Sequence, residues 1–186
     1  MDDTIRNITK IMLQYDTGVP GIVIIGLFVI MAGIVTGLYV TRKDYSSFFR
    51  NTSLSVLMGY AFFILCATIW FREKTEYARC YMNPFESYDD LYYKMIAEIL
   101  LNVLFFIPIG FLLAAAMKRE RFIFVLCTGC MFSLTIETAQ LLCHRGVCNI
   151  DDVFHNTLGC AIGYVVYRLC KSIQKIFTKR NIILSD

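Results

Sequence analysis

The sequence predicts an all-α fold: a polytopic membrane helix bundle of about five transmembrane helices, with an N-terminal interfacial helix. Composition is the first observation, because 57% of the 186 residues are hydrophobic and only 18% are charged, whereas soluble domains carry about 25% charged residues. The second is a series of apolar windows of about 20 residues, the length that crosses a bilayer. The third is that Lys and Arg concentrate in alternate connectors. The windows lie at 21–40, 52–71, 97–117, 122–142 and 157–176.

Residues 1–19 are expected to form a short amphipathic helix on the membrane surface. Ile5, Ile8, Met12 and Tyr15 recur at helical spacing, which places apolar side chains on one face. The rest of the chain divides between its second and third windows. We therefore predict an interfacial helix at 1–19, two N-terminal transmembrane helices at 20–71 and a three-helix region at 72–178.

The third and fourth windows each carry polar side chains on one face. Glu98 and Asn102 lie one helical turn apart. Ser133, Glu137 and Gln140 recur at intervals of four and three residues, which again aligns them. Ionisable side chains at bilayer depth are costly, so Glu137 is a candidate functional residue. The structural alternative is that these groups only join helices through hydrogen bonds.

A second polar stripe begins where the chain enters the fifth window. Asp152 and Asn156 share a helical face with Gly159 and Gly163. Glycines one turn apart let two helix backbones approach closely, so we predict that Gly159 and Gly163 serve helix packing. Because a short connector joins the fourth and fifth windows, these helices are expected to be antiparallel neighbours with facing stripes.

The basic residues predict how the bundle is oriented. Lys and Arg are dense in the connectors at 41–51 and 118–121 and from Arg168 onward, and such segments stay in the cytoplasm. The N-terminus and the polar ends of the last three windows then face outward. The candidate binding residues collected at this outer end are Arg79, Asn102, Glu137, Gln140, Arg145, Asp151, Asp152 and Asn156.

Acids, amides and arginines make up this set. Acid and amide oxygens suit hard cations such as Ca²⁺ and Mg²⁺, whereas His144 and His155 lie on different predicted elements and match no zinc pattern. We therefore predict no metal or cofactor, with a divalent cation as the alternative. Arg79 and Arg145 either bind a phosphate or carboxylate of a ligand or form ion pairs with Glu137 and Asp151.

The eight cysteines do not indicate a disulfide framework. Most lie within or at the ends of apolar windows, where a thiol behaves as a small hydrophobic group. Cys143 and Cys148 bracket the polar connector, and Cys80 lies in the longest loop, at 72–96. The sequence leaves open whether Cys143 pairs with Cys148 or whether Cys80 pairs with either of them.

The spaced combination of these residues resembles the VanZ-like family of bacterial membrane proteins. The resemblance covers about residues 79–167. At one point the chain departs from the family pattern, because Asn83 directly precedes Pro84 instead of lying three residues before it. The matching motifs are Asn102, Phe106-Ile-Pro108-x-Gly110-Phe111, Glu137-x-x-Gln140, Arg145, and Asp151-Asp152-Val-x-x-Asn156-x-x-Gly159-x-x-x-Gly163-Tyr164.

The resemblance implies a multi-pass protein of the bacterial cell membrane, linked to low-level resistance to the glycopeptide teicoplanin. Three functions follow as hypotheses. The first is a protein that binds or masks a lipid-linked cell-wall precursor or the lipoglycopeptide at the outer leaflet. The second is an intramembrane enzyme whose carboxylates act by acid–base chemistry on a polyprenyl-phosphate-type headgroup. The third is a small transporter or flippase component. Nucleic acid is not an expected partner.

Overall fold

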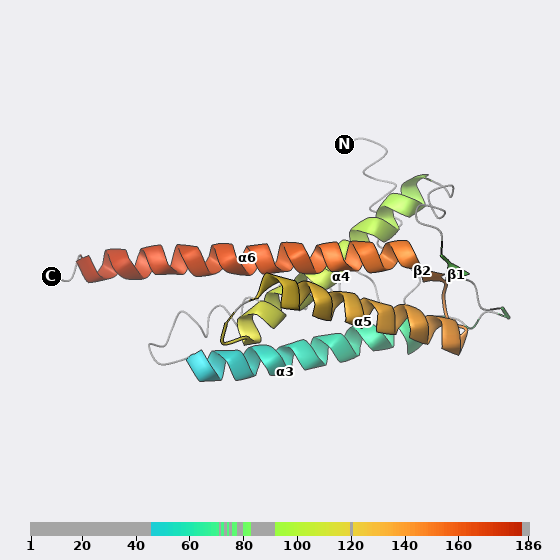
Figure 1. The fold of residues 1–186 in the computed structure, drawn as a ribbon, viewed down its shortest axis with the longest axis horizontal. Coiled ribbons are helices and arrows are strands. Elements are labelled where there is room, and N and C mark those ends of the chain that lie inside the picture. The colour runs from blue at the N-terminus through green and yellow to red at the C-terminus, as the bar shows by residue number, and fades with distance from the viewer. Residues whose placement is uncertain are drawn as a thin grey trace.

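The computed structural model describes residues 46–70, 72, 74, 76–77, 80–82, 92–119 and 121–183. The predicted interfacial helix at 1–19 and the first predicted span at 21–40 lie outside these residues. The described part is mostly helical and has four α-helices (Figure 1). They are α3 (Ser46–Leu65), α4 (Tyr92–Ala116), α5 (Phe122–Cys143) and α6 (Ile150–Ile183).

Three short elements complete the described fold. The π-helical segment η1 (Cys66–Trp70) continues α3. The strands β1 (Cys80–Tyr81) and β2 (Cys148–Asn149) pair in parallel, with Cys80 opposite Cys148 and Tyr81 opposite Asn149. Both strands lie at the end of the bundle where α5 ends and α6 begins (Figure 1). A two-stranded sheet was not among the sequence predictions.

Three of the described helices are long and apolar enough to cross a membrane: Phe49–Ile69, Ile96–Ala116 and Phe122–Cys143. They coincide with the second, third and fourth predicted windows. The fifth predicted span, 157–176, lies within α6, which is not among the three. Glycines, tyrosines, Arg168 and Lys171 lower the mean hydropathy of that window. The described residues thus form a helical membrane bundle with three candidate spans.

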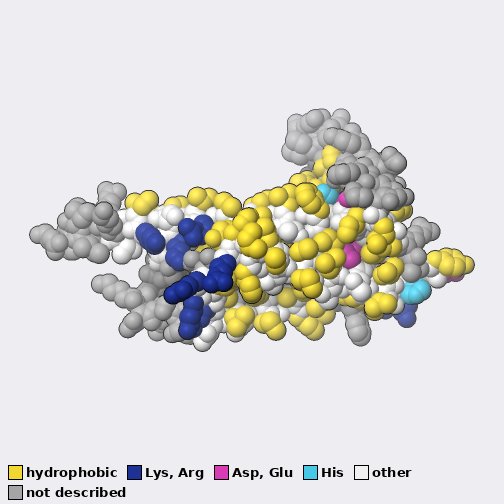
Figure 2. Space-filling model, viewed as in Figure 1, with side chains coloured by type: hydrophobic (Ala, Val, Ile, Leu, Met, Phe, Trp, Pro, Cys, Tyr) yellow, Lys and Arg dark blue, Asp and Glu magenta, His cyan; other side chains and the backbone are white. Residues whose placement is uncertain are grey.

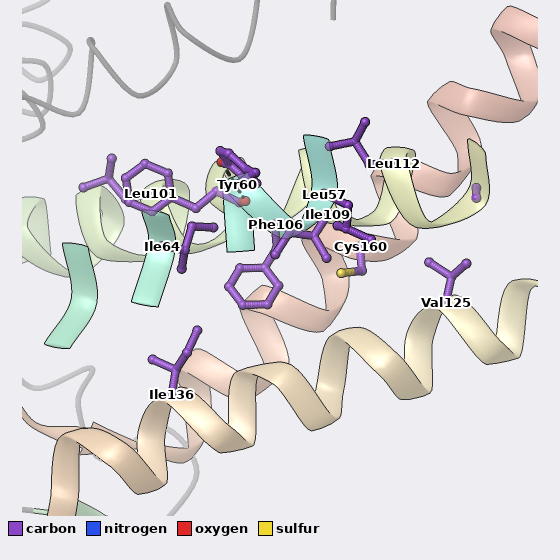
Figure 3. Close-up of a cluster of buried hydrophobic side chains, with 12 residues drawn as sticks. Leu57, Tyr60, Ile64, Leu101, Phe106, Ile109, Leu112, Val125, Ile136 and Cys160 are labelled. Carbon is purple, nitrogen blue, oxygen red and sulfur yellow. Dashed lines mark hydrogen bonds between the residues drawn. The ribbon is translucent and has the colours of Figure 1, made fainter. Parts of the chain in front are cut away.

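Helix α4 contacts α3, α5 and α6 and occupies the centre of the bundle. A cluster of buried apolar side chains from all four helices surrounds it (Figure 3). Many large apolar side chains instead point outward (Figure 2), among them Phe62, Met131 and Ile162. An apolar outer surface is what lipid requires of a membrane bundle. The labelled members of the buried cluster are Leu57, Tyr60, Ile64, Leu101, Phe106, Ile109, Leu112, Val125, Ile136 and Cys160.

Helices α4 and α6 approach so closely that their contact has no room for side chains at the glycine positions. A Cβ atom added at Gly159 would meet the Val103 carbonyl oxygen and lie 2.8 Å from the Phe106 Cβ. A Cβ at Gly163 would meet the Ile107 carbonyl oxygen and lie 2.7 Å from the backbone nitrogen of Phe111. The two glycines therefore set the distance between α4 and α6.

The two ends of the bundle differ in charge, although the strand end holds Arg72, Lys74 and Arg145 besides its acids. Figure 2 shows Lys and Arg gathered toward the end at which α6 finishes, and Asp and Glu nearer the opposite end. The loop between α4 and α5 and the C-terminal part of α6 supply the basic residues, which include Lys118, Arg119, Arg121, Arg168, Lys171 and Lys175. The end with the acidic residues is the one that holds the strands.

Candidate functional site

A group of polar side chains, here called the polar cluster, lies where α5 ends and α6 begins. Glu137 occupies the last two turns of α5, and its side chain is only 5% exposed. Asp151 and Asp152 occupy the first turn of α6. The polar cluster consists of Arg72, Glu98, Asn102, Ser133, Glu137, Gln140, Asn149, Asp151, Asp152 and Asn156.

The connector between α5 and α6 brings its own backbone to Glu137. His144 adopts a left-handed conformation (φ 53°) and ends α5, and the Arg145 N–H donates to the Gln140 carbonyl at 3.0 Å. Gly146 also has a positive φ, 85°, a conformation that glycine adopts at little cost. After this reversal the Asn149 backbone N–H donates to Glu137 Oε2 at 2.8 Å.

Asn149 also starts α6. Its Oδ1 accepts a hydrogen bond from the Asp151 N–H at 3.1 Å, the pattern of an N-cap residue. Its Nδ2 lies 3.4 Å from Asp152 Oδ1, to which it donates. One residue therefore connects the Glu137 carboxylate, the helix start and Asp152.

Among the described acids outside the three candidate spans, Asp152 is the one whose pKa departs most from its usual value. Burial raises its pKa to about 7, the nearby Glu98 carboxylate adds to this, and Arg72 opposes it. Asp151 raises the pKa further, while a hydrogen bond with the Asn102 side chain lowers it. Asp152 therefore meets side chains from α4, from the residues after η1 and from its own helix. Glu137 lies close enough to interact electrostatically with both Asp152 and Arg72.

A second set of polar contacts extends the cluster toward the middle of the bundle. Asn156 Nδ2 donates to Ser133 Oγ at 2.8 Å, which joins α6 to α5. Gln140 Nε2 donates to the Thr68 carbonyl at 3.1 Å, which joins α5 to η1. Within the part of the chain that the structure describes, Gln140 Oε1 and Asn156 Oδ1 are buried without a hydrogen-bond partner. Buried acceptors of this kind are costly, so they are available to a ligand or to water.

The two described arginines near the cluster have different surroundings. Arg145 Nη1 donates to the carbonyl oxygens of Arg72 and Ile69, at 3.0 and 3.4 Å. Arg145 also forms a backbone bridge with Lys74, so it holds the chain that follows η1. The guanidinium whose charge acts on both Glu137 and Asp152 is that of Arg72.

The structure places most of the predicted residues at one end of the bundle. Asn102, Glu137, Gln140, Asp151, Asp152 and Asn156 belong to the polar cluster, Arg145 lies beside it, and Gly159 and Gly163 lie against α4. Arg79 is outside the described residues. No group of three or more His, Cys, Asp or Glu side chains in the described ranges is placed to hold a metal ion.

Sequence reasoning missed Arg72 and Asn149. Arg72 directly follows the aromatic pair Trp70-Phe71 that ends the second apolar window, a position where a basic side chain meets the membrane interface. Asn149 stands just before Ile150-Asp151-Asp152, and an amide followed by acids in the first turn is a helix start signal. Both patterns can be read in the sequence, but neither of them shows that Arg72 or Asn149 lies beside Glu137.

One comparison with known proteins gives a match. The family model described as VanZ/LLP1 matches residues 24–171, a range that includes nearly all of the predicted transmembrane windows. No curated protein and no solved structure matches the chain. The family match confirms the resemblance carried by the motifs between Asn102 and Tyr164, and it covers well over half of the chain. The chain therefore belongs to the VanZ/LLP1 family.

Proposed function

We propose that this protein binds, and thereby masks, a lipid-linked cell-wall precursor or a lipoglycopeptide such as teicoplanin at the outer leaflet of the bacterial membrane. The observation that carries the proposal is the polar cluster itself. Two carboxylates, Glu137 and Asp152, and two open amide acceptors, on Gln140 and Asn156, lie together at one end of an apolar bundle. Acceptors in excess favour a ligand rich in hydroxyl, amide or ammonium donors.

Both ligand classes supply such donors together with an apolar chain. Sugar hydroxyls, peptide N–H groups and amines would meet the carboxylates and amides, and the Arg72 guanidinium would favour a phosphate or carboxylate. The prenyl or acyl chain would lie along the outward apolar side chains of the bundle, such as Phe62 and Met131. A ligand of this kind would place its polar groups at the polar cluster and its apolar chain along the lipid-facing side chains.

Direct binding to the full-length protein in lipid nanodiscs tests the proposal. Teicoplanin and a polyprenyl-diphosphate-linked disaccharide pentapeptide are the two probes, each titrated against wild type and measured by calorimetry. Saturable binding of one probe at about one ligand per protein is expected. Absence of saturable binding for both probes would contradict the proposal.

The outward orientation of the polar cluster has its own test. Cys143 is exposed at the end of α5, so an impermeant maleimide should label it in intact cells. A cysteine placed by Arg119→Cys, in the basic loop at the other end, should be labelled only after lysis. Mapping the labelled peptides by mass spectrometry separates the two positions. The reverse pattern would place the polar cluster in the cytoplasm.

The pair of carboxylates also supports a second candidate, an intramembrane enzyme acting on a polyprenyl-phosphate-type headgroup. Burial raises the pKa of Asp152 to about 7, and a group with a pKa near the working pH is suited to acid–base catalysis. Glu137 interacts with Asp152 electrostatically, as expected where two acids take different roles. Incubation with a polyprenyl diphosphate separates the candidates. Phosphate release beyond one equivalent per protein would favour the enzyme.

A further inference from the structure

Two cysteines from distant parts of the sequence face each other across the small parallel sheet. Cys80 in β1 is the register partner of Cys148 in β2, and the Cys80 Sγ donates to the Cys148 Sγ at 2.7 Å. We propose that Cys80 and Cys148 are joined by a disulfide bond in the protein in its membrane, and that this bond holds β2 over the polar cluster. The proposal rests on the outward orientation given under Proposed function, because disulfides persist in oxidising compartments.

The geometry selects this pair among the three cysteines in question. Neighbouring strands lie about 4.8 Å apart, and a disulfide spans Cα atoms about 4.4–6.8 Å apart. Paired strand positions therefore meet the requirement without movement of the backbone. Cys143 ends α5 with an exposed side chain, and the left-handed turn at His144 follows it before the chain reaches Cys148.

The bond would act on the polar cluster through the residue after Cys148. Asn149 donates its backbone N–H to Glu137 and caps α6 through its side chain. Each of the two paired strands is only two residues long, and so short a ladder contributes few hydrogen bonds. A covalent link between β1 and β2 would keep Asn149 beside Glu137 when the ladder opens.

The bond forms by exchange with an external disulfide, either a small-molecule disulfide or that of a thiol–disulfide oxidoreductase. Either thiol can attack first, as its thiolate, and the products are the same. When the Cys80 sulfur attacks, it displaces one thiol of the external disulfide and forms a mixed disulfide. The Cys148 sulfur then attacks the Cys80 sulfur and releases the second thiol. Two protein thiols are oxidised, and one external disulfide is reduced to two thiols.

Mapping the cysteines of the wild-type protein tests the proposal directly. Cells are quenched in acid, free thiols are blocked with N-ethylmaleimide, and the full-length protein is digested without reduction. A linked peptide containing Cys80 and Cys148 is expected in most of the material, with the other six of the eight cysteines blocked. A link between Cys143 and Cys148, or both Cys80 and Cys148 blocked, would overturn the proposal.

Oxidation of the purified protein separates this inference from the function on which it rests. Reduced protein in nanodiscs, treated with oxidised glutathione, should form the Cys80–Cys148 link whether or not any ligand binds. Failure to form it overturns the disulfide but leaves the ligand-binding proposal standing. A link that forms in nanodiscs but is missing from quenched cells overturns the disulfide as a native feature. The maleimide labelling of Cys143 reports the orientation independently.

Matched serine variants measure what the bond contributes. Cys80→Ser and Cys148→Ser should each lower the Tm of the oxidised protein by about 5 °C or more, because the link closes a long loop. Reductant should lower the wild-type Tm by the same amount and leave both variants unchanged. Cys143→Ser, at an exposed position at the end of α5, is the control and should respond to reductant as wild type does. Equal Tm values for oxidised and reduced wild type would contradict the proposal that the Cys80–Cys148 bond holds β2 in place.

Discussion

Helix α6 presents two different surfaces to its neighbours. Toward α4 it offers Gly159 and Gly163, and the two backbones meet with no space for a side chain. Toward α5 it offers Asn156 and the residues around Asp152, which meet Ser133 and Glu137 through hydrogen bonds and charge. The glycine surface is filled by the α4 backbone. The polar surface includes a buried acceptor on Asn156 with no hydrogen-bond partner among the described residues. We therefore propose that the glycine surface serves folding and the polar surface serves binding.

The largest effect is expected from a change on the glycine surface. Gly163→Leu should prevent the native bundle from forming, because its side chain would meet the backbone of α4 at Ile107 and Phe111. Overpacking typically costs about 1–3 kcal/mol and occasionally more, and a clash with backbone atoms belongs at the upper end of that range. Yield of monodisperse protein in detergent and its Tm are the measurements. Gly59→Leu is the control, since an added Cβ at Gly59 meets nothing within 4 Å. Normal yield and Tm for Gly163→Leu would show that close packing at Gly163 is not needed for folding.

On the polar surface the expected loss is in binding and not in folding. Glu137→Gln and Asp152→Asn keep shape and most hydrogen bonding but remove charge, so each should weaken binding of the responsive probe about tenfold or more while expression stays near normal. Calorimetry in nanodiscs measures the binding, and Glu76→Gln, at an exposed acid before β1, is the matched control. If the carboxylates serve only to join helices, the amide variants should be silent. Alanine replacements should then cost about 0.6–2 kcal/mol each.

Arg72 and Arg145 are expected to differ in the same way, one affecting binding and the other stability. Arg72→Gln should weaken binding about tenfold or more, and the double variant with Glu137→Gln should be no worse than the stronger single variant, because the two charges act as a unit. Arg145→Gln should instead lower the Tm and leave the affinity of the folded protein near wild type, since Arg145 Nη1 donates to backbone carbonyls. If the losses of binding free energy for Arg72→Gln and Glu137→Gln add up in the double variant, the two side chains do not act as a unit.

The smallest effect is a pH dependence of stability that arises from Asp152. Its pKa is raised from 3.8 to about 7 in the folded protein, so the folded state binds the proton more tightly than the unfolded state. Stability is then greatest below about pH 4 and is lost as the pH rises through 7. The wild-type Tm should fall by several degrees between pH 5 and pH 8 because of this group, and Asp152→Asn should remove that fall. If the Tm of Asp152→Asn falls with pH as steeply as that of wild type, Asp152 is not the source of the pH dependence.

Several parts of the site could be anticipated from the sequence because they depend on local spacing. Ser133, Glu137 and Gln140 align on one face of any α-helix, as do Asp152, Asn156, Gly159 and Gly163. The short connector required α5 and α6 to be antiparallel neighbours, so the contact of Asn156 with Ser133 follows from the pattern. The pairing of Glu137 with an arginine does not follow. Arg145 is nearer in sequence, but among the described arginines it is Arg72 whose charge acts on both Glu137 and Asp152.

The sequence by itself determined the helical class, three apolar spans and the family, since these depend on composition, on hydropathy within one segment and on motif spacing. Only the tertiary structure decided which distant residues meet. It placed Arg72 beside Glu137 and Asp152, and it brought β1 against β2 so that Cys80 faces Cys148. It also turned the Asn149 N–H toward Glu137. These contacts join segments that no periodicity relates, and their geometry depends on how the helices pack and how the connectors reverse the chain.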